Sequence, residues 1–143
     1  LELVKSGDYI VTGLGSAEGR EFMTNLHTIA DRVKGVLVSN CLPMGAYEFI
    51  VNPEYKESFT TEGWFYTPVL RKAHKNGNVS FIPNHLHLAA KKRLFYREPD
   101  IYVGIASMPD KHGYVSLSLS NTYEMAMIKK AKTVIATVRC LLP

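Results

Sequence analysis

Short apolar runs alternate along this chain with longer segments whose apolar residues recur every three or four positions. A run of the first kind predicts a buried strand, and the helical spacing predicts an amphipathic helix. The predicted strands span residues 8–12, 35–40, 79–83, 101–107 and 133–138, and the predicted helices span residues 16–33, 67–75, 86–95 and 121–131. Because strands alternate with helices, the connections are crossovers, and we expect a largely parallel sheet with helices on both faces.

Two segments depart from this alternation. Residues 41–63 hold two prolines and show no clean period, so we expect irregular structure there. In residues 114–120 apolar side chains alternate with serine, which is the period of a half-buried strand, and a turn at residues 109–113 would join that strand to the preceding one as a hairpin. The expected fold class is α/β, with a mostly parallel mixed sheet in a single domain over residues 1–143.

The stretch VTGLGSAEGREFMTNL leads from a predicted strand through a glycine turn into a predicted helix with Ser16 as its N-cap. Strand, glycine turn and helix N-terminus together form a common cradle for phosphate. The glycines, however, are spaced G-x-G-x-x-x-G rather than G-x-G-x-x-G. The second strand also ends in Ser39-Asn40, where a dinucleotide site needs an acidic residue. A nicotinamide-dependent oxidoreductase is therefore only a weaker hypothesis.

Two carboxylates are assigned to helix starts. Glu18 would lie near the positive end of the helix that begins at Ser16, and Glu124 completes an Asn-x-x-Glu capping box with Asn121. Both assignments are structural, and neither residue is nominated as a nucleophile.

Motifs for metal and hydrolase chemistry are weak or missing. His85 and His87 are the only histidines close in sequence, and their side chains diverge on a helix, so we expect no metal site. Ser16 lacks the second glycine of a G-x-S-x-G nucleophile elbow, and no P-loop lysine follows the glycines.

Composition and charge narrow the classes of function. The 143 residues are 46% hydrophobic and 21% charged, as in an ordinary globular domain, and no apolar run approaches the roughly 20 residues that cross a bilayer. The net charge of +4 suits an anionic ligand. The basic clusters lie in predicted helices without interleaved aromatic residues, so nucleic acid is not an expected partner. Two distant cysteines favour a reducing, cytoplasmic location.

The two ends of the sequence have the pattern of interior parts of a longer chain. Residues 1–7, LELVKSG, are typical of the last turn of a helix closed by glycine, and Pro143 follows directly after an apolar strand. We therefore expect a further domain in the complete protein.

Three longer stretches carry the most specific pattern. They read VKSGDYIVTGLGSAEGREFMTNL, FYTPVLRKAHKNGNVSFIPNHL and PDIYVGIASMPDKHGYVSLSLSNTYEMAMIKKAKTVIATV. Together they resemble the N-terminal half of the family I CoA-transferases of the acetyl-CoA hydrolase/transferase type, which includes 4-hydroxybutyrate, butyrate and acetate CoA-transferases. The third stretch is similar to a family hairpin whose positions are taken here by Asp100, Ser107, Asp110, Gly113, Tyr114 and Ser116. The sequence departs from the family pattern at Gly19, where proline is usual, and at Arg139, where asparagine is expected.

The resemblance implies a mechanism and its partners. Such enzymes move CoA between carboxylic acids through a covalent glutamyl-CoA thioester, with coenzyme A or acyl-CoA as substrate and no permanently bound cofactor. The nucleophilic glutamate lies in the C-terminal half of the family, so we expect no catalytic residue in this chain and no activity from it alone. The implied partners are that C-terminal catalytic domain, acyl-CoA, short-chain carboxylates and a second copy of the protein. The same sequence features also fit an acetyl-CoA hydrolase or a non-catalytic α/β binding module.

The strand-end loops of this half would line the cleft between the two halves, the usual place for a ligand in open α/β folds. The candidate residues for the CoA or substrate cleft are Gly13, Gly15, Ser16, Pro83, Asn84, His85, Ser107, Asp110 and Gly113.

Overall fold

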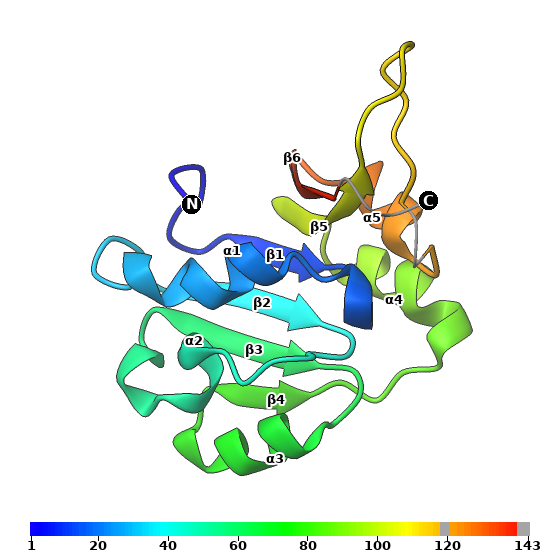
Figure 1. Ribbon diagram of the computed structural model, residues 1–143. Helices are drawn as coiled ribbons and strands as arrows, with labels where there is room; N and C mark the ends of the chain where they lie inside the picture. Colours follow the sequence, from blue (N-terminus) through cyan, green and yellow to red (C-terminus); the bar gives the residue numbers. More distant parts are fainter. Residues whose placement is uncertain (118–120, 140–143) are drawn as a thin grey trace.

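The computed structural model describes residues 1–117 and 121–139, and these residues form one sheet of six strands (Figure 1). The strand order is β4-β3-β2-β1-β5-β6, and all pairings between neighbouring strands of the sheet are parallel. The strands are β1 (Tyr9–Thr12), β2 (Val36–Asn40), β3 (Phe59–Gly63), β4 (Val79–Phe81), β5 (Ile101–Ser107) and β6 (Thr133–Arg139). The expected α/β class with a mostly parallel sheet is confirmed.

Helices cover both faces of this sheet, as expected. One face carries α1 (Arg20–Asn25), α2 (Glu48–Val51) and α3 (Pro68–Ala73), and the other carries α4 (Ala89–Tyr96) and α5 (Glu124–Ile128). Single 3-10 turns extend or join them: η1 (Gly15–Ala17), η2 (Leu26–Ile29), η3 (Pro53–Tyr55), η4 (His74–Asn76) and η5 (Leu86–Leu88).

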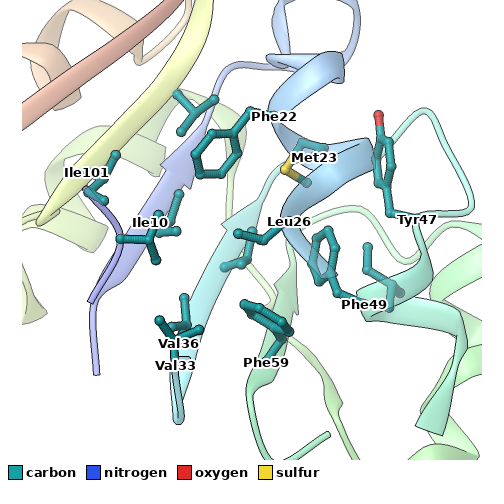
Figure 2. Close-up of a cluster of buried hydrophobic side chains, with 14 of the residues drawn as sticks. Ile10, Phe22, Met23, Leu26, Val33, Val36, Tyr47, Phe49, Phe59 and Ile101 are labelled. Carbon is teal, nitrogen blue, oxygen red and sulfur yellow. The ribbon is translucent and has the colours of Figure 1, made fainter. Parts of the chain in front are cut away.

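Two separate cores fill the two faces. The larger core lies under α1, α2 and α3, where Phe22 and Leu26 pack with Phe49 and Phe59 against the strands (Figure 2). The smaller core lies under α4 and α5 and is built around Tyr9, Trp64, Tyr102, Tyr123 and Met127. Successive residues of β1 and β5 point into different cores, which is why these strands are apolar at nearly every position.

The helix α3 shows how local sequence sets the element boundaries. Pro68 occupies the first turn, where a missing N–H costs nothing, and the Thr67 hydroxyl accepts a hydrogen bond from the Leu70 N–H. The 3-10 turn that follows ends at Gly77, whose φ of 81° is the left-handed conformation that favours glycine. Start and stop signals in the sequence therefore place this helix correctly.

The predicted hairpin does not extend the sheet. Because β5 is paired with β1 on one side and with β6 on the other, no edge beside it is open to an antiparallel neighbour. Residues 108–117 instead form an arm that projects from the body of the domain (yellow in Figure 1), and residues 114–117 are not a strand. The remainder of the predicted strand, 118–120, lies outside the described residues. The described sheet is thus parallel rather than mixed.

Three further expectations are corrected. Residues 41–63 are not irregular throughout but contain the helix α2 and the strand β3. The sequence pattern does not reveal β3 because two of its buried positions are Thr61 and Gly63 rather than large apolar residues. The helix expected from residue 16 is divided, because the backbone at Glu18 is extended, with a ψ of 141°, and α1 begins only at Arg20. Residues 1–7 form turns, not a helix end, although Gly7 has the expected left-handed φ of 78°.

Candidate functional site

The carboxyl ends of the parallel strands all lie at one edge of the sheet. The crossovers run from β1 outward through β2, β3 and β4 on one side, and β5 and β6 occupy the other side of β1. The order therefore reverses between β1 and β5. In open α/β sheets a ligand binds at this switch point, outside the carboxyl ends of the strands.

The glycine turn after β1 stands at this switch point. The Gly13 N–H donates to the Val103 carbonyl of β5 at 2.9 Å, and the Leu14 N–H donates to Glu124 Oε1 at 2.9 Å. A Cβ on Gly13 would lie 2.4 Å from the Ala17 carbonyl oxygen, so the turn needs glycine there for close backbone approach. Two N–H groups of the turn are thus already used within the chain.

Glu124 closes this turn from the face that carries α5. The residue is 1% exposed, and its Oε2 accepts the backbone N–H groups of Thr122 at 2.6 Å and Tyr123 at 2.8 Å. The helix expected from Asn121 begins only at Glu124, with Tyr123 as its N-cap, so the predicted capping box with Asn121 does not start the helix, and the carboxylate instead also reaches the turn after β1. A buried carboxylate held against this turn repels phosphate, which counts against a dinucleotide site.

Glu18 lies on the opposite face of the same turn. It is 2% exposed and accepts hydrogen bonds from Asn40 Nδ2, the Met44 N–H and the Tyr47 hydroxyl. Figure 2 shows the Tyr47 ring beside α1, with its hydroxyl directed away from Phe49. Burial and the hydrogen bond to Glu18 raise the pKa of Tyr47, so this hydroxyl stays protonated and can donate.

The smaller core contains the buried thiol of Cys41 together with the phenol side chains of Tyr102 and Tyr123. The Tyr123 hydroxyl donates to the Thr12 carbonyl at 2.8 Å, and burial raises the pKa of Cys41 to about 12, with the Glu124 charge acting in the same direction. Burial also raises the pKa of Tyr102 and Tyr123. The thiol is therefore protonated and unreactive at neutral pH.

Buried polar atoms without a partner lie at the same edge. Among the described residues, Thr12 Oγ1 and Asn40 Oδ1, at the ends of β1 and β2, accept or donate no hydrogen bond although both residues are fully buried. Such atoms are uncommon in folded proteins.

The predicted site residues after β1 and β4 have different surroundings. Ser16 is exposed within η1, and its side chain makes no capping bond, so its expected role as N-cap is wrong. Pro83 and His85 are exposed, while the half-buried Asn84 lines a small hollow with Cys41 and Trp64. The Asn84 Nδ2 is buried and has no partner among the described residues.

The predicted site residues after β5 organise the arm. Ser107 Oγ accepts the Ser116 N–H at 2.9 Å and so closes the base of the arm. Near the tip, Asp110 Oδ1 accepts the N–H groups of His112 at 2.8 Å and Tyr114 at 2.9 Å, and Gly113 takes a left-handed φ of 85°. Asp110 and Gly113 therefore form the turn of the arm, away from the switch point (Figure 1).

All nine candidates lie at or beyond the carboxyl ends of strands, but only some of them meet. The Gly13–Ser16 turn follows β1 and Ser107 ends the neighbouring strand β5, whereas residues 83–85 follow β4, three strands from β1. Glu18, Asn40 and Glu124, which hold the turn, are not among the site residues that the sequence predicts. Glu18 has no local sequence signal for this role, because its hydrogen-bond donors come from Asn40, Met44 and Tyr47.

Two further features concern metal binding and membrane crossing. Among the described residues, no group of three or more His, Cys, Asp or Glu side chains could hold a metal ion. No helix in this part of the chain is long and apolar enough to cross a membrane.

Two curated relatives carry the names of CoA-transferases. The chain is 29% identical over 141 residues to the succinyl-CoA:cyclohexane-1-carboxylate CoA transferase of Geobacter metallireducens, covering 95% of this chain and 31% of that protein. It is 29% identical over 147 residues to a probable butyrate:acetyl-CoA coenzyme A-transferase of Syntrophomonas wolfei, covering 98% of this chain and 31% of that protein. The chain therefore spans about a third of the length of these relatives.

A solved structure has a similar fold. The crystal structure of RipA from Yersinia pestis superimposes with a TM-score of 0.88 at 22% sequence identity, over 99% of this chain and 35% of that one. The family model for the acetyl-CoA hydrolase/transferase N-terminal domain matches residues 1–143. The chain belongs to the family of acetyl-CoA hydrolase/transferase N-terminal domains.

Proposed function

We propose that this chain is the N-terminal domain of a CoA-transferase that moves CoA between small carboxylic acids. The observation that carries the proposal is the family match over residues 1–143, combined with relatives of about three times this length that transfer CoA. The other two thirds of such a protein would supply the catalytic domain. The expected substrates are acetyl-CoA, butyryl-CoA or 4-hydroxybutyryl-CoA and the matching acids.

The proposed reaction divides one acyl transfer into reversible steps. A glutamate carboxylate attacks the acyl-CoA carbonyl, which gives an acyl–glutamyl anhydride and releases CoA thiolate. The thiolate then attacks the glutamyl carbonyl, so that a glutamyl-CoA thioester forms and the first acid leaves as its carboxylate. The incoming acid attacks this thioester, and the thiolate finally attacks the new acyl group, which regenerates the glutamate.

The two most buried glutamates of this chain support a nucleophile elsewhere. A nucleophilic carboxylate must reach the substrate, but Glu18 and Glu124 are almost fully buried and are occupied by N–H and O–H donors from neighbouring loops. Their role in the proposal is to shape the turn after β1. The strand-end loops, including the Gly13–Ser16 turn and the arm base at Ser107, would wall the cleft that faces the catalytic domain.

The complete protein tests this proposal directly. Incubated with acetate and butyryl-CoA, it should produce acetyl-CoA and butyrate, measured by chromatography of the CoA esters. Borohydride should inactivate the enzyme only after treatment with acyl-CoA, because it reduces the glutamyl thioester.

Three further results would distinguish the proposed transferase from the alternatives. Residues 1–143 alone should give no exchange. Release of free CoA from acetyl-CoA without an acid acceptor would assign a hydrolase, the other activity in the family's description. A complete protein that neither exchanges nor hydrolyses acyl-CoA would overturn the proposal in favour of a non-catalytic module.

A further inference from the structure

The helix α4 has two sides of different character. Toward the sheet, Ala89 is buried, Leu94 packs against the smaller core, and Arg93 reaches the Tyr9 hydroxyl. The side away from the sheet, which we call the outer face of α4, is formed by residues three or four positions apart, which share one side of a helix. They line a groove with a volume of about 350 Å³ and are Leu88, Lys91, Lys92, Phe95 and Tyr96.

The outer face is apolar where a helix that faces water is normally polar. Phe95 is 83% exposed and Tyr96 is 76% exposed, and their rings meet edge to face with centroids 5.4 Å apart. The half-buried Leu88 lies at the N-terminal end of α4 and lines the same groove. Single exposed apolar residues are common, but apolar side chains that share one groove are typical of an interaction surface.

The two lysines of the outer face differ from the basic residues around them. Those neighbours are paired with carboxylates: Arg93 with Glu62, Arg97 and Lys132 with Asp100, and Lys130 with Glu98. Lys91 and Lys92 are exposed, and in the part of the chain that the structure describes neither of them forms an ion pair. The groove therefore combines aromatic side chains with two uncompensated positive charges, which complements an apolar segment that carries carboxylates.

We propose that the outer face of α4 is the docking surface for an acidic, partly apolar segment of the other two thirds of the complete protein. The inference rests on the proposed function only in placing this chain within a protein of about three times its length, like the two relatives. Because both parts belong to one polypeptide, the effective concentration of the segment is high, and a small groove suffices to hold it. The aromatic pair lies at the end of α4 that leads to the start of β5, so docking leaves the carboxyl edge of the sheet open to substrate.

The charges and the size of the groove argue against two other occupants. A second copy that docked through the same face would bring the lysines of both copies together, and like charges repel. A membrane surface would attract the lysines, but one short helix offers little apolar area to insert. A carboxylate-bearing segment of the same protein fits both the charge and the size.

Carbodiimide coupling of the complete protein tests the contact directly, because it joins a lysine amine to a carboxylate that touches it. Peptide mass spectrometry should find Lys91 or Lys92 linked to an aspartate or glutamate beyond residue 143. The ion pair of Lys130 with Glu98, at 2.8 Å, is the internal control for the coupling. Protein assembled from isotope-labelled and unlabelled copies shows whether the link lies within one chain.

A substitution in the complete protein tests the apolar part of the groove. Phe95→Ser should lower the midpoint of thermal unfolding by about 3 °C, because it removes an aromatic side chain from an interface. The matched control is Leu3→Ser, since Leu3 is also exposed, at 60%, but its neighbours in sequence pack in the larger core on the other face of the sheet. It should shift the midpoint by less than about 1 °C.

The charges are tested by comparing reversal with neutralisation. With an acidic segment docked, Lys91→Glu combined with Lys92→Glu should lower the midpoint more than Lys91→Gln combined with Lys92→Gln. Without such a segment the order should be the opposite, because acidic residues near the start of a helix are favourable and the net charge of the chain is +4.

The outcomes separate this inference from the proposed function. Coupling of Lys130 to Glu98 without any link from Lys91 or Lys92 to a residue beyond 143 overturns the docking surface, and so does a link found only between two copies. Binding to vesicles that contain phosphatidylserine, abolished by Lys91→Glu with Lys92→Glu, overturns it in favour of a membrane. None of these measurements depends on transferase activity, so a complete protein that shows the expected link but transfers no CoA contradicts only the proposed function.

Discussion

Gly13 is the residue at which the sheet, the turn and the site are most tightly constrained. Its N–H is bonded to β5, and its Cα lies against the Ala17 carbonyl group. Gly13→Ala places a methyl group on that backbone oxygen, so the turn must open. We expect the variant to lose about 1–3 kcal/mol in the free energy of unfolding, measured by urea denaturation monitored by circular dichroism.

Ser16→Ala is the control within the same turn. Because the Ser16 side chain is exposed and caps no helix, its replacement should change the free energy of unfolding by less than about 0.5 kcal/mol. A loss of about 1 kcal/mol would instead restore Ser16 as the N-cap that its sequence position indicates.

The residues around this turn show what sequence can and cannot establish about the site. The glycines and their place after a buried strand follow from residue type and spacing alone. The inward turn of Glu18 does not, because it depends on donors from the β2–α2 loop, more than twenty residues away in sequence. Glu124 is intermediate: its hydrogen bonds to the N–H groups of Thr122 and Tyr123 are local, whereas its bond to the Leu14 N–H joins residues 110 positions apart.

Between elements, Arg93 ties α4 to the sheet. Its guanidinium group forms an ion pair with Glu62 of β3, donates to the Tyr9 hydroxyl of β1 at 2.7 Å and stacks near the rings of Tyr9 and Trp64. Both partners of the ion pair are largely buried, so Arg93→Met leaves the Glu62 carboxylate without its cation. We expect a loss of about 3–5 kcal/mol in the free energy of unfolding, measured by urea denaturation.

A second substitution identifies the cause of that loss. Glu62→Gln added to Arg93→Met removes the uncompensated charge and should recover part of the stability. Lys130→Met breaks the exposed pair with Glu98 and should leave the urea midpoint where it was. If Arg93→Met lowers the free energy of unfolding no more than Lys130→Met does, the ion pair does not stabilise the packing of α4 on the sheet.

The elements themselves follow largely from the sequence. Strands β1, β2 and β5 coincide with apolar runs because burial on both faces requires apolar residues throughout. The edge strands β4 and β6 also coincide with apolar runs, although they are partly exposed, and the helix α3 coincides with its capping signals. β3 is not evident from the sequence because Thr60 and Thr61 give it little apolar character. The serine-alternating segment has the period of a strand, but a strand also needs a free neighbouring edge, and the sequence does not reveal that β5 has none.

Across the whole molecule, Asp100 joins β1, β5, β6 and the segment after α4 at the amino edge of the sheet. Its carboxylate accepts the Tyr9 N–H at 2.9 Å and the side chains of Arg97 at 2.9 Å and Lys132 at 2.7 Å. Burial alone would raise the pKa of Asp100, but these donors outweigh it and lower the pKa below its ordinary value. Asp100→Asn should cost about 1–3 kcal/mol in the free energy of unfolding at pH 7.

The same pKa shift fixes the direction of the pH dependence. Because the folded state holds this group at a lower pKa than the unfolded chain, its contribution is complete above about pH 4 and is lost as the pH falls through the folded pKa. Urea denaturation at pH 7 and pH 3 should therefore show wild type and Asp100→Asn becoming more alike at the lower pH. A constant difference between them at both values would show that the charge of Asp100 contributes nothing.

The central place of β1 also determines when the domain can fold. Ile10 pairs with Val38 on one side and with Ile101 on the other, so one edge of the first strand stays open until the ribosome has completed β5. A nascent chain that ends before β5 presents an unpaired apolar edge, which favours aggregation. Closing so long a loop is also slow compared with forming local contacts. The glycine turn is therefore synthesised well before β5 and is among the last parts of the domain to reach its final geometry.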